Sequence, residues 1–311
     1  MKSTSTHQQE LKHLYQKGDR LYSIGKLETA LKTFQKALEI TRLINSNELR
    51  LDIVYRLGLV HCRIGEYVNA LKYLDLALEL AKKIKNDTKI ATIYNEKGET
   101  YRFLGENSSA LQCYSQALKI FRKQQDTVGI GKTLNHISTI YNRLELSAKS
   151  LNCARKSLNI FQKLRQSGKI DTIASQINES TALHNMGEAY LLLLRPRQAQ
   201  AFLEMALEMR KKLWQDSLER LTFSLDYINE LSQNQDNGNI YPKKQATYKH
   251  EQNDGFHKSI VAQYGTDLLT TMNLMEKVYK SLGQQQQADN YHQQALEIGT
   301  KVNNHSWCLI G

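Results

Sequence analysis

The sequence predicts an all-α protein, a right-handed α-solenoid of about six helix hairpins with an insertion before the last hairpin. The main observation is that small residues recur at an interval of 40 residues over three successive segments. The recurring set is Gly18, Gly58 and Gly98; Gly25, Gly65 and Gly105; Ala30, Ala70 and Ala110; and Ala37, Ala77 and Ala117. In addition, the 311 residues include only 2 prolines, the residue least compatible with a helix interior. Such strict self-similarity is typical of repeat arrays, in which each unit buries its apolar face by stacking on its neighbours.

The first repeat unit shows why small residues are needed at these places. Its sequence LYQKGDRLYSIGKLETALKTFQKALEI reads as two amphipathic helices joined at Gly25. Glycine suits this turn because the left-handed backbone conformation that ends a helix is sterically free for it. Small residues let the two helices approach closely, and large apolar residues fill the space between them: Leu14, Leu21, Leu27, Leu31 and Phe34.

This pattern resembles the tetratricopeptide repeat, a hairpin with a small and a large residue in its first helix, a turn glycine, and two alanines flanking a large residue in its second helix. The third unit matches it best, with Gly98, Tyr101, Gly105, Ala110, Tyr114 and Ala117. The usual period of the family is about 34 residues. Longer units of this kind are similar to those of Leu-Gly-Asn repeat proteins, Rap regulators and MalT-like activators. The resemblance implies binding of a protein or peptide without identifying the partner.

The spacing also predicts how the chain is divided. The fourth unit keeps the 40-residue step with a weaker pattern, and the fifth recovers the pattern at Gly187, nine residues later than strict phasing predicts. A polar stretch without periodicity then precedes the last unit. The expected segments are a flexible N-terminus (1–10), four regular units (11–164), a fifth unit with an extended connection and a long second helix (165–231), a polar mobile loop (232–255), the last unit (256–298) and a C-terminal tail (299–311).

Composition excludes several classes of protein. No apolar run reaches the roughly 18 residues that a membrane span needs, and residues 1–10 lack the apolar stretch of a secretory signal. The 4 cysteines are too scattered for a disulfide framework or a zinc site. We therefore expect a soluble, cytoplasmic protein with no metal.

The net charge of +11 is concentrated in the middle of the chain. Residues 101–200 contain 14 Lys and Arg against 6 Asp and Glu, whereas residues 201–311 contain 11 against 13. A basic middle could attract acidic peptides, nucleic acid or an anionic membrane. Because the charges are spread along helices without a dense run, ordinary solvated helix faces are the simpler interpretation.

The resemblance places the candidate binding residues in a concave groove, which the first helices of successive tetratricopeptide units line. Steps of three or four residues along the exposed face of each first helix give the candidates. They are Tyr15, Asp19, Tyr22, Tyr55, Asn95, Glu99, Arg102, Lys132, Asn135, Asn142, His184, Asn273 and Lys277. Asn95 and Asn135 occupy the same place in adjacent units. Their amides could both donate to and accept from a peptide backbone, or could simply be solvated.

Three further observations bear on the class of ligand. Arg102 and Lys132 could pair with a carboxylate. Tyr15 and Asp19 occupy the places where co-chaperones of this family carry a Lys and an Asn that grip a C-terminal carboxylate, which argues against a chaperone tail as ligand. The stretch DTVGIGKT lacks the first glycine of a nucleotide-binding loop, since Asp126 stands there.

The sequence contains no arrangement of residues that indicates catalysis. We expect a non-enzymatic scaffold or adaptor that binds a partner peptide or helix in its groove, with no cofactor and no small-molecule substrate. One alternative is a peptide-sensing signalling regulator of the Rap type. The other is an assembly factor whose basic surface associates with RNA or a membrane.

Overall fold

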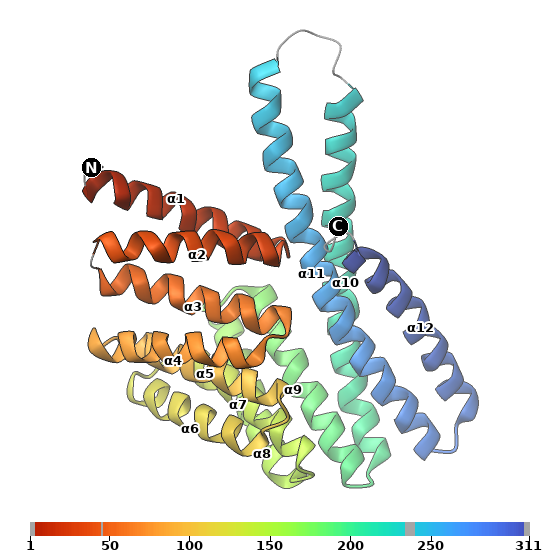
Figure 1. Ribbon diagram of the computed structural model, residues 1–311. Coiled ribbons are helices and arrows are strands. Elements are labelled where there is room, and N and C mark those ends of the chain that lie inside the picture. Colours follow the sequence, from red (N-terminus) through yellow and green to blue (C-terminus); the bar gives the residue numbers. More distant parts are fainter. Residues whose placement is uncertain (1–3, 45, 234–239, 308–311) are drawn as a thin grey trace. The chain divides into compact units, whose positions relative to one another are not determined.

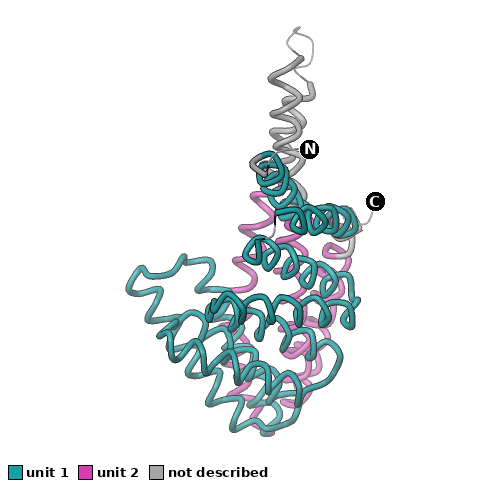
Figure 2. The backbone as a smooth tube through the Cα atoms, turned by 60° about the vertical axis from the view of Figure 1, so that its left-hand side comes forward, with its two compact units in different colours: residues 1–22, 27–193 teal, residues 23–26, 194–311 magenta. Residues whose placement is uncertain are grey.

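The computed structural model describes residues 4–44, 46–233 and 240–307, and within these ranges the secondary structure is helical without strands (Figure 1). The chain divides into two compact units (Figure 2). We call them the N-terminal body, residues 1–22 and 27–193, and the C-terminal body, residues 23–26 and 194–311. Each body is described by itself.

The N-terminal body is a stack of helix hairpins. Its helices are α1 (Thr4–Ser23), α2 (Leu27–Ile44), α3 (Asn47–Ile64), α4 (Tyr67–Lys83), α5 (Asp87–Phe103), α6 (Asn107–Lys123), α7 (Thr127–Arg143), α8 (Ser147–Gln166) and α9 (Thr172–Leu192). The odd-numbered helices are the first helices of the predicted units. Within the stack, each of α4, α6 and α8 packs on its own first helix and on the first helix of the next unit, and α3, α5, α7 and α9 lie successively beside one another.

Close approach between the helices of a hairpin depends on the small residues. Gly98 faces the ring of Tyr114, which is completely buried, and a Cβ atom added at Gly98 would stand 2.6 Å from that ring. Gly105 ends α5 with a φ of +78°, a conformation that favours glycine. The fourth unit has Glu145 at the equivalent turn, where it adopts a φ of 56°. This strained substitution agrees with the weaker repeat pattern of that unit.

The fourth unit also replaces packed small residues by serines. Ser138 on α7 and Ser150 on α8 are completely buried, and their hydroxyl oxygens are 2.8 Å apart. Each hydroxyl is also 3.1 Å from the other residue's backbone carbonyl, so its one hydrogen can be donated either to that carbonyl or to the other hydroxyl. Since buried polar groups need partners, this reciprocal pair allows serine to stand where other units have glycine and alanine.

The nine additional residues before the fifth unit are distributed over three places. Helix α8 has 20 residues against 17 in α6, and α9 has 21 against 17 in α7. The connection grows from three residues (124–126) to five (167–171). The prediction of an extended connection therefore accounts for two of the nine residues, and the longer helices account for the other seven.

The C-terminal body contains α10 (Pro196–Gln233), α11 (Ile240–Ser281) and α12 (Gln285–Trp307). Helix α11 packs on both α10 and α12. The core of this body includes Leu207 and Trp214 of α10, Val261 and Leu268 of α11 and Ile298 of α12. Pro196 begins α10, where its missing N–H leaves no helical hydrogen bond unmade.

The prediction of a loop over residues 232–255 is wrong for the part of this segment that the structure describes. Helix α10 continues to Gln233 and α11 begins at Ile240, while residues 234–239 lie outside the described residues. The segment lacks apolar periodicity, but its Lys, Gln, Glu and Ala residues have good helix propensity. Pro242 falls in the first turn of α11, where proline is tolerated.

Three other predicted boundaries also differ from the structure. Residues 4–10 of the predicted flexible N-terminus belong to α1, and residues 299–307 of the predicted tail belong to α12. The last unit, predicted over 256–298, is therefore longer at both ends. Both termini lack the apolar pattern that marks a packed helix, so the sequence alone did not indicate that the helices extend into them.

Replacing Gly98 by alanine should destabilise the protein by about 1–3 kcal/mol, because the new methyl group would displace the buried Tyr114 ring. Gly299 in α12 is the matched control, since no atom lies within 4 Å of an added Cβ. Gly299→Ala should leave stability unchanged or raise it by about 0.5–1 kcal/mol. Urea unfolding followed by far-UV circular dichroism measures both changes, and equal effects would contradict the close-packing explanation.

Candidate functional site

A pocket of about 260 Å³ lies between the first helices α5 and α7 of the third and fourth units. It is lined by residues of α5, α7, the end of α6 and the turn that follows it. These residues are Thr88, Thr92, Asn95, Glu96, Glu99, Phe121, Asp126, Val128, Gly129, Lys132 and His136. Four of the predicted groove residues are thus at or beside this pocket, namely Asn95, Glu99 and Lys132 in its wall and Arg102 bonded to Glu99.

Glu96 and His136 are among the pocket residues that were absent from the predicted set. They are 40 residues apart and therefore occupy the same place on adjacent first helices, and Arg56 holds that place in the unit before them. The steps of three or four residues used in the sequence analysis gave Asn95 and Glu99, on either side of Glu96, but did not give Glu96 itself. A comparison of charged residues at the repeat interval would have found this row.

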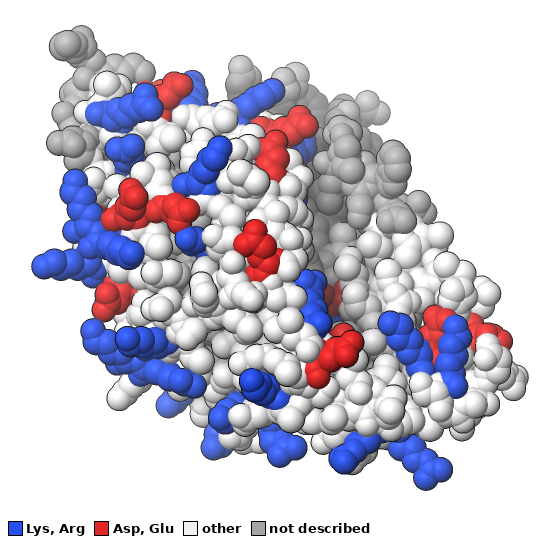
Figure 3. Space-filling model, turned by 60° about the horizontal axis from the view of Figure 1, so that its bottom comes forward, with Lys and Arg blue, Asp and Glu red and all other residues white. Residues whose placement is uncertain are grey.

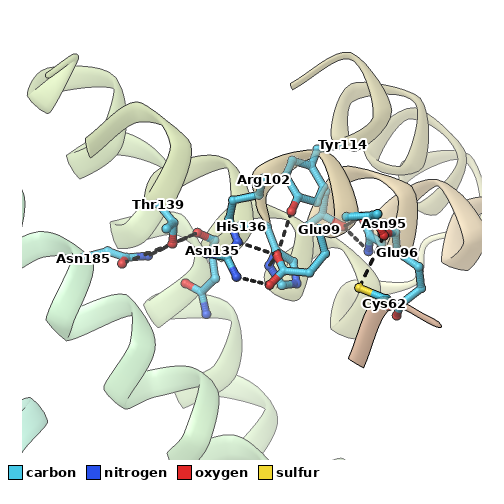
Figure 4. Close-up of polar contacts among 12 residues, drawn as sticks. Cys62, Asn95, Glu96, Glu99, Arg102, Tyr114, Asn135, His136, Thr139 and Asn185 are labelled. Carbon is cyan, nitrogen blue, oxygen red and sulfur yellow. Dashed lines mark hydrogen bonds and ion pairs between the residues drawn. The ribbon is translucent and has the colours of Figure 1, made fainter. Parts of the chain in front are cut away.

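Glu99 is the centre of a polar cluster that joins α5, α6 and α7 (Figure 4). Arg102 donates two hydrogen bonds to its carboxylate, and the Tyr114 hydroxyl donates a third over 3.0 Å. The His136 ring stacks on Tyr114 with centroids 5.3 Å apart, and its Nδ1 is 3.6 Å from Glu99 Oε2. Glu99 is therefore occupied by partners within the protein.

The charge states in this cluster follow from its surroundings. Burial by itself would raise the pKa of Glu99, but the Arg102 hydrogen bond and the neighbouring His136 and Tyr114 hold that pKa below its usual value. Burial lowers the pKa of His136, and the nearby Glu99 carboxylate only partly opposes this shift. At neutral pH, Glu99 is therefore ionised and His136 is neutral.

Glu96 has a different environment. Its side chain is half-buried in the pocket wall, and no hydrogen bond or ion pair from another described residue reaches its carboxylate. Burial, followed by repulsion from Glu99, raises its pKa to about 7, against the attraction of Lys132 and Arg56. Glu96 is thus the pocket carboxylate that lacks a partner within the described part of the chain.

Asn95 connects adjacent repeats across the pocket. Its amide nitrogen donates to Thr133 Oγ1 of α7 over 2.9 Å, and that hydroxyl donates to the backbone carbonyl of Gly129 over 2.7 Å. The predicted partner of Asn95 in a peptide-binding row, Asn135, is placed differently. The two residues do not form a row of free amides.

Asn135 and Asn142 bind α7 to α9. Both are nearly completely buried, with 4% and 3% of their surfaces exposed. Asn135 donates to the carbonyl of Asn178 over 3.0 Å, and Asn142 donates to the carbonyl of Asn185 and to Glu188, both over 2.9 Å. Their amide nitrogens are therefore committed to inter-repeat contacts, in contrast to the predicted ligand-facing arrangement. The physical reason is that α9 packs along the face of α7 that carries these residues.

The predicted residues of the first two units also join neighbouring helices. Arg56 pairs with Asp19 over 2.8 Å and donates to the Tyr15 hydroxyl over 3.3 Å. The Arg63 guanidinium lies 5.0 Å from the ring centre of Tyr22. Similarly, Lys89 lies 4.8 Å from the ring centre of Tyr55. These contacts span about one repeat and bind each first helix to the next.

The remaining predicted residues lie away from this pocket. His184 is a half-buried residue of α9. Asn273 and Lys277 are exposed on α11, in the C-terminal body. Within the described residues, no group of three or more His, Cys, Asp or Glu side chains is arranged to hold a metal ion, and no helix is long and apolar enough to cross a membrane.

Residues 50–123 match the family model of the tetratricopeptide repeat. This segment covers most of α3 and all of α4, α5 and α6, the units in which the repeat pattern is strongest. The match identifies residues 50–123 as tetratricopeptide repeats, and the stacked hairpins show a helical-repeat fold around them. No curated protein matches the sequence.

Solved structures share this fold over nearly the whole chain. The apo form of RapI has a TM-score of 0.61 at 13% identity, with 95% of this chain and 99% of RapI covered. BtubC from P. vanneervenii has a TM-score of 0.59 at 18% identity, with coverages of 89% and 92%. NprR in complex with its cognate peptide NprX has a TM-score of 0.52 at 15% identity, with coverages of 94% and 69%.

Substituting Asn142 by alanine should destabilise the protein by about 1–3 kcal/mol, because it removes two hydrogen bonds that this nearly buried amide donates to α9. Asn152→Ala, at an exposed position of α8, is the control and should change stability by less than about 0.5 kcal/mol. Urea unfolding measures both variants. A neutral Asn142→Ala variant would show that this residue does not hold α7 to α9.

Proposed function

We propose that this protein is a non-enzymatic cytoplasmic scaffold that binds a peptide segment of a partner protein along the first helices of the N-terminal body. The observation that carries the proposal is the open pocket between α5 and α7, whose wall includes charged side chains. Many polar side chains on the first helices form contacts with the neighbouring repeat. Glu96 and Lys132 line the pocket and could contact a ligand. A surface with unused polar groups at its centre is suited to a ligand that supplies their partners.

The size of the pocket supports a peptide ligand. Its volume of about 260 Å³ is below the range of about 300–1,000 Å³ that is usual for pockets enclosing a drug-sized molecule. It suits a single side chain of a longer chain, with the rest of the peptide lying along the neighbouring helices. The peptide-contacting residues in this proposal are Glu96, Glu99, Lys132 and His136, with Arg102 holding Glu99 in place.

One alternative is a peptide-sensing regulator, in which the bound peptide changes the affinity for a second protein. The similarity in fold to NprR, whose structure contains the peptide NprX, supports this alternative. Both readings place a peptide in the same groove. They differ in whether peptide binding alters the interaction with a second protein, which a competition measurement between peptide and partner would decide.

Filling the pocket tests the proposed function without changing its charge. Thr92→Trp would place an indole in the pocket wall, and Ser115→Trp on the exposed face of α6 is the matched control. Random linear peptides displayed on phage are first selected on the wild-type protein. We expect Thr92→Trp to weaken the selected peptides about tenfold or more, equivalent to about 1.4 kcal/mol, and Ser115→Trp to leave their affinity unchanged. Failure to select any peptide, or equal binding by both variants, would refute the proposal.

A second candidate function is supported by the charge of two adjacent helices. Helices α6 and α8 contain no Asp or Glu, and they carry Lys119, Arg122, Lys123, Lys149, Arg155, Lys156, Lys163 and Arg165. Figure 3 shows more Lys and Arg than Asp and Glu on one face of the protein. These helices would attract RNA or an anionic membrane.

Salt dependence tests this second candidate. If α6 and α8 bind phosphates, affinity for a single-stranded RNA or for vesicles containing an anionic lipid should fall steeply between about 50 and 200 mM salt. The double variant Lys156→Glu and Lys163→Glu should weaken binding further at every salt concentration. Absence of association even at the lowest salt concentration would eliminate the basic-surface function.

A further inference from the structure

We propose that the pocket between α5 and α7 binds a cationic side chain, Lys or Arg, of the bound peptide, with the Glu96 carboxylate as its counter-charge. This inference rests on the proposed function and specifies which chemical group the pocket accepts.

The charges of the pocket favour a cation, although the whole chain has a net charge of +11. Three carboxyl groups line it, from Glu96, Glu99 and Asp126, against one ammonium group, from Lys132. Glu99 is bonded to Arg102 and Tyr114. Asp126 caps α7 by accepting a hydrogen bond from the Gly129 amide over 2.9 Å. The carboxylate left for a ligand is therefore that of Glu96.

Holding an unpaired, ionised carboxylate in a partly buried site costs free energy, and pairing with a ligand cation would offset this cost. Partial desolvation weakens hydration of the charge, and the nearby Glu99 repels it. Lys132 attracts the Glu96 carboxylate, but no ion pair within 4.0 Å joins the two side chains, and Lys132 is exposed. An ammonium or guanidinium group in the pocket would supply the missing short-range partner. An anionic ligand group would instead be repelled by the Glu96 carboxylate.

The rest of the pocket wall suits the aliphatic part of such a side chain. Phe121 and Val128 contribute apolar surface, and Gly129 contributes backbone without a side chain. Lys and Arg bury their methylene stems against apolar surface while the charged head contacts polar groups. The pocket thus combines an apolar wall for the stem with an acidic wall for the head.

Binding should depend on pH because Glu96 must be ionised to pair with a cation. Its pKa of about 7 in the free protein means that the counter-charge is lost as the pH falls below neutrality. The other ionisable groups that interact electrostatically with Glu96 are Glu99, Arg56, Lys132, Cys62, Tyr22, Tyr55 and Tyr114. Burial raises the pKa of Cys62 and of the three tyrosines, and Glu99 is ionised, so they do not titrate near neutrality. His136 stays neutral near pH 7, and its protonation at lower pH would repel the ligand further.

The test uses pools of short synthetic peptides with acetylated N-termini and amidated C-termini, so that the side chains carry the only charges. The central residue is fixed as Lys, Arg, norleucine or Glu, and the flanking positions are mixed. Binding to the full-length protein is measured by fluorescence anisotropy. We expect the Lys or Arg pool to bind about tenfold more tightly than the norleucine pool, and this preference to increase about tenfold from about pH 6 to about pH 8.

Three variants separate the role of Glu96 from general effects. Glu96→Gln should abolish both the preference for a cation and its pH dependence. Glu96→Asp keeps the charge on a shorter side chain and should retain the pH dependence with weaker affinity. Glu79→Gln, at an exposed position of α4, makes the same change in net charge as Glu96→Gln and should behave as the wild type. Unfolding curves establish that each variant is folded.

The outcomes distinguish this inference from the function on which it rests. Binding of all pools with similar affinity, preference for the Glu pool, or a cation preference that survives in Glu96→Gln would overturn the inference and leave peptide binding intact. If no pool binds the wild-type protein at any pH, both the inference and the proposed peptide-binding function are refuted.

Discussion

The distance between the two helices of a hairpin is the constraint on which the rest of the structure depends. At Gly98 the backbone of α5 lies directly against the buried ring of Tyr114, and this contact is possible only without a side chain. The Tyr114 hydroxyl donates a hydrogen bond to Glu99, and the Tyr114 ring stacks on His136 of the next repeat. A single aromatic residue therefore sets the spacing within one hairpin and contributes to the polar cluster beside the pocket.

Polar residues on the first helices have two uses that compete with each other. Adjacent first helices must be held together, and contacts such as Arg56 with Asp19 and Asn142 with Glu188 do so. A side chain that binds the next repeat has fewer groups to offer a ligand. Under the proposed function, ligand binding therefore uses places where a repeat contact is incomplete, such as Glu96 in the pocket wall.

The sequence predicted the fold well because packing between repeats imposes a strict interval on small residues. It predicted the exposure of polar residues on the first helices less well, since these residues follow no comparable interval. Asn135 and Asn142 were placed on the correct helix, but their burial follows from the packing of α9 along α7, which no local pattern indicates. The helix over 240–255 was not predicted because this polar segment lacks apolar periodicity, although its residues have good helix propensity.

The lengthened fifth unit shows how such an array can change size without losing its register. The four additional residues of α9 amount to little more than one helical turn of 3.6 residues, so the helix faces before and after them remain nearly aligned. The addition extends the helix by about 6 Å along its axis. Lengthening by about a whole turn therefore lets one helix of the array grow while the same faces stay turned towards its neighbours.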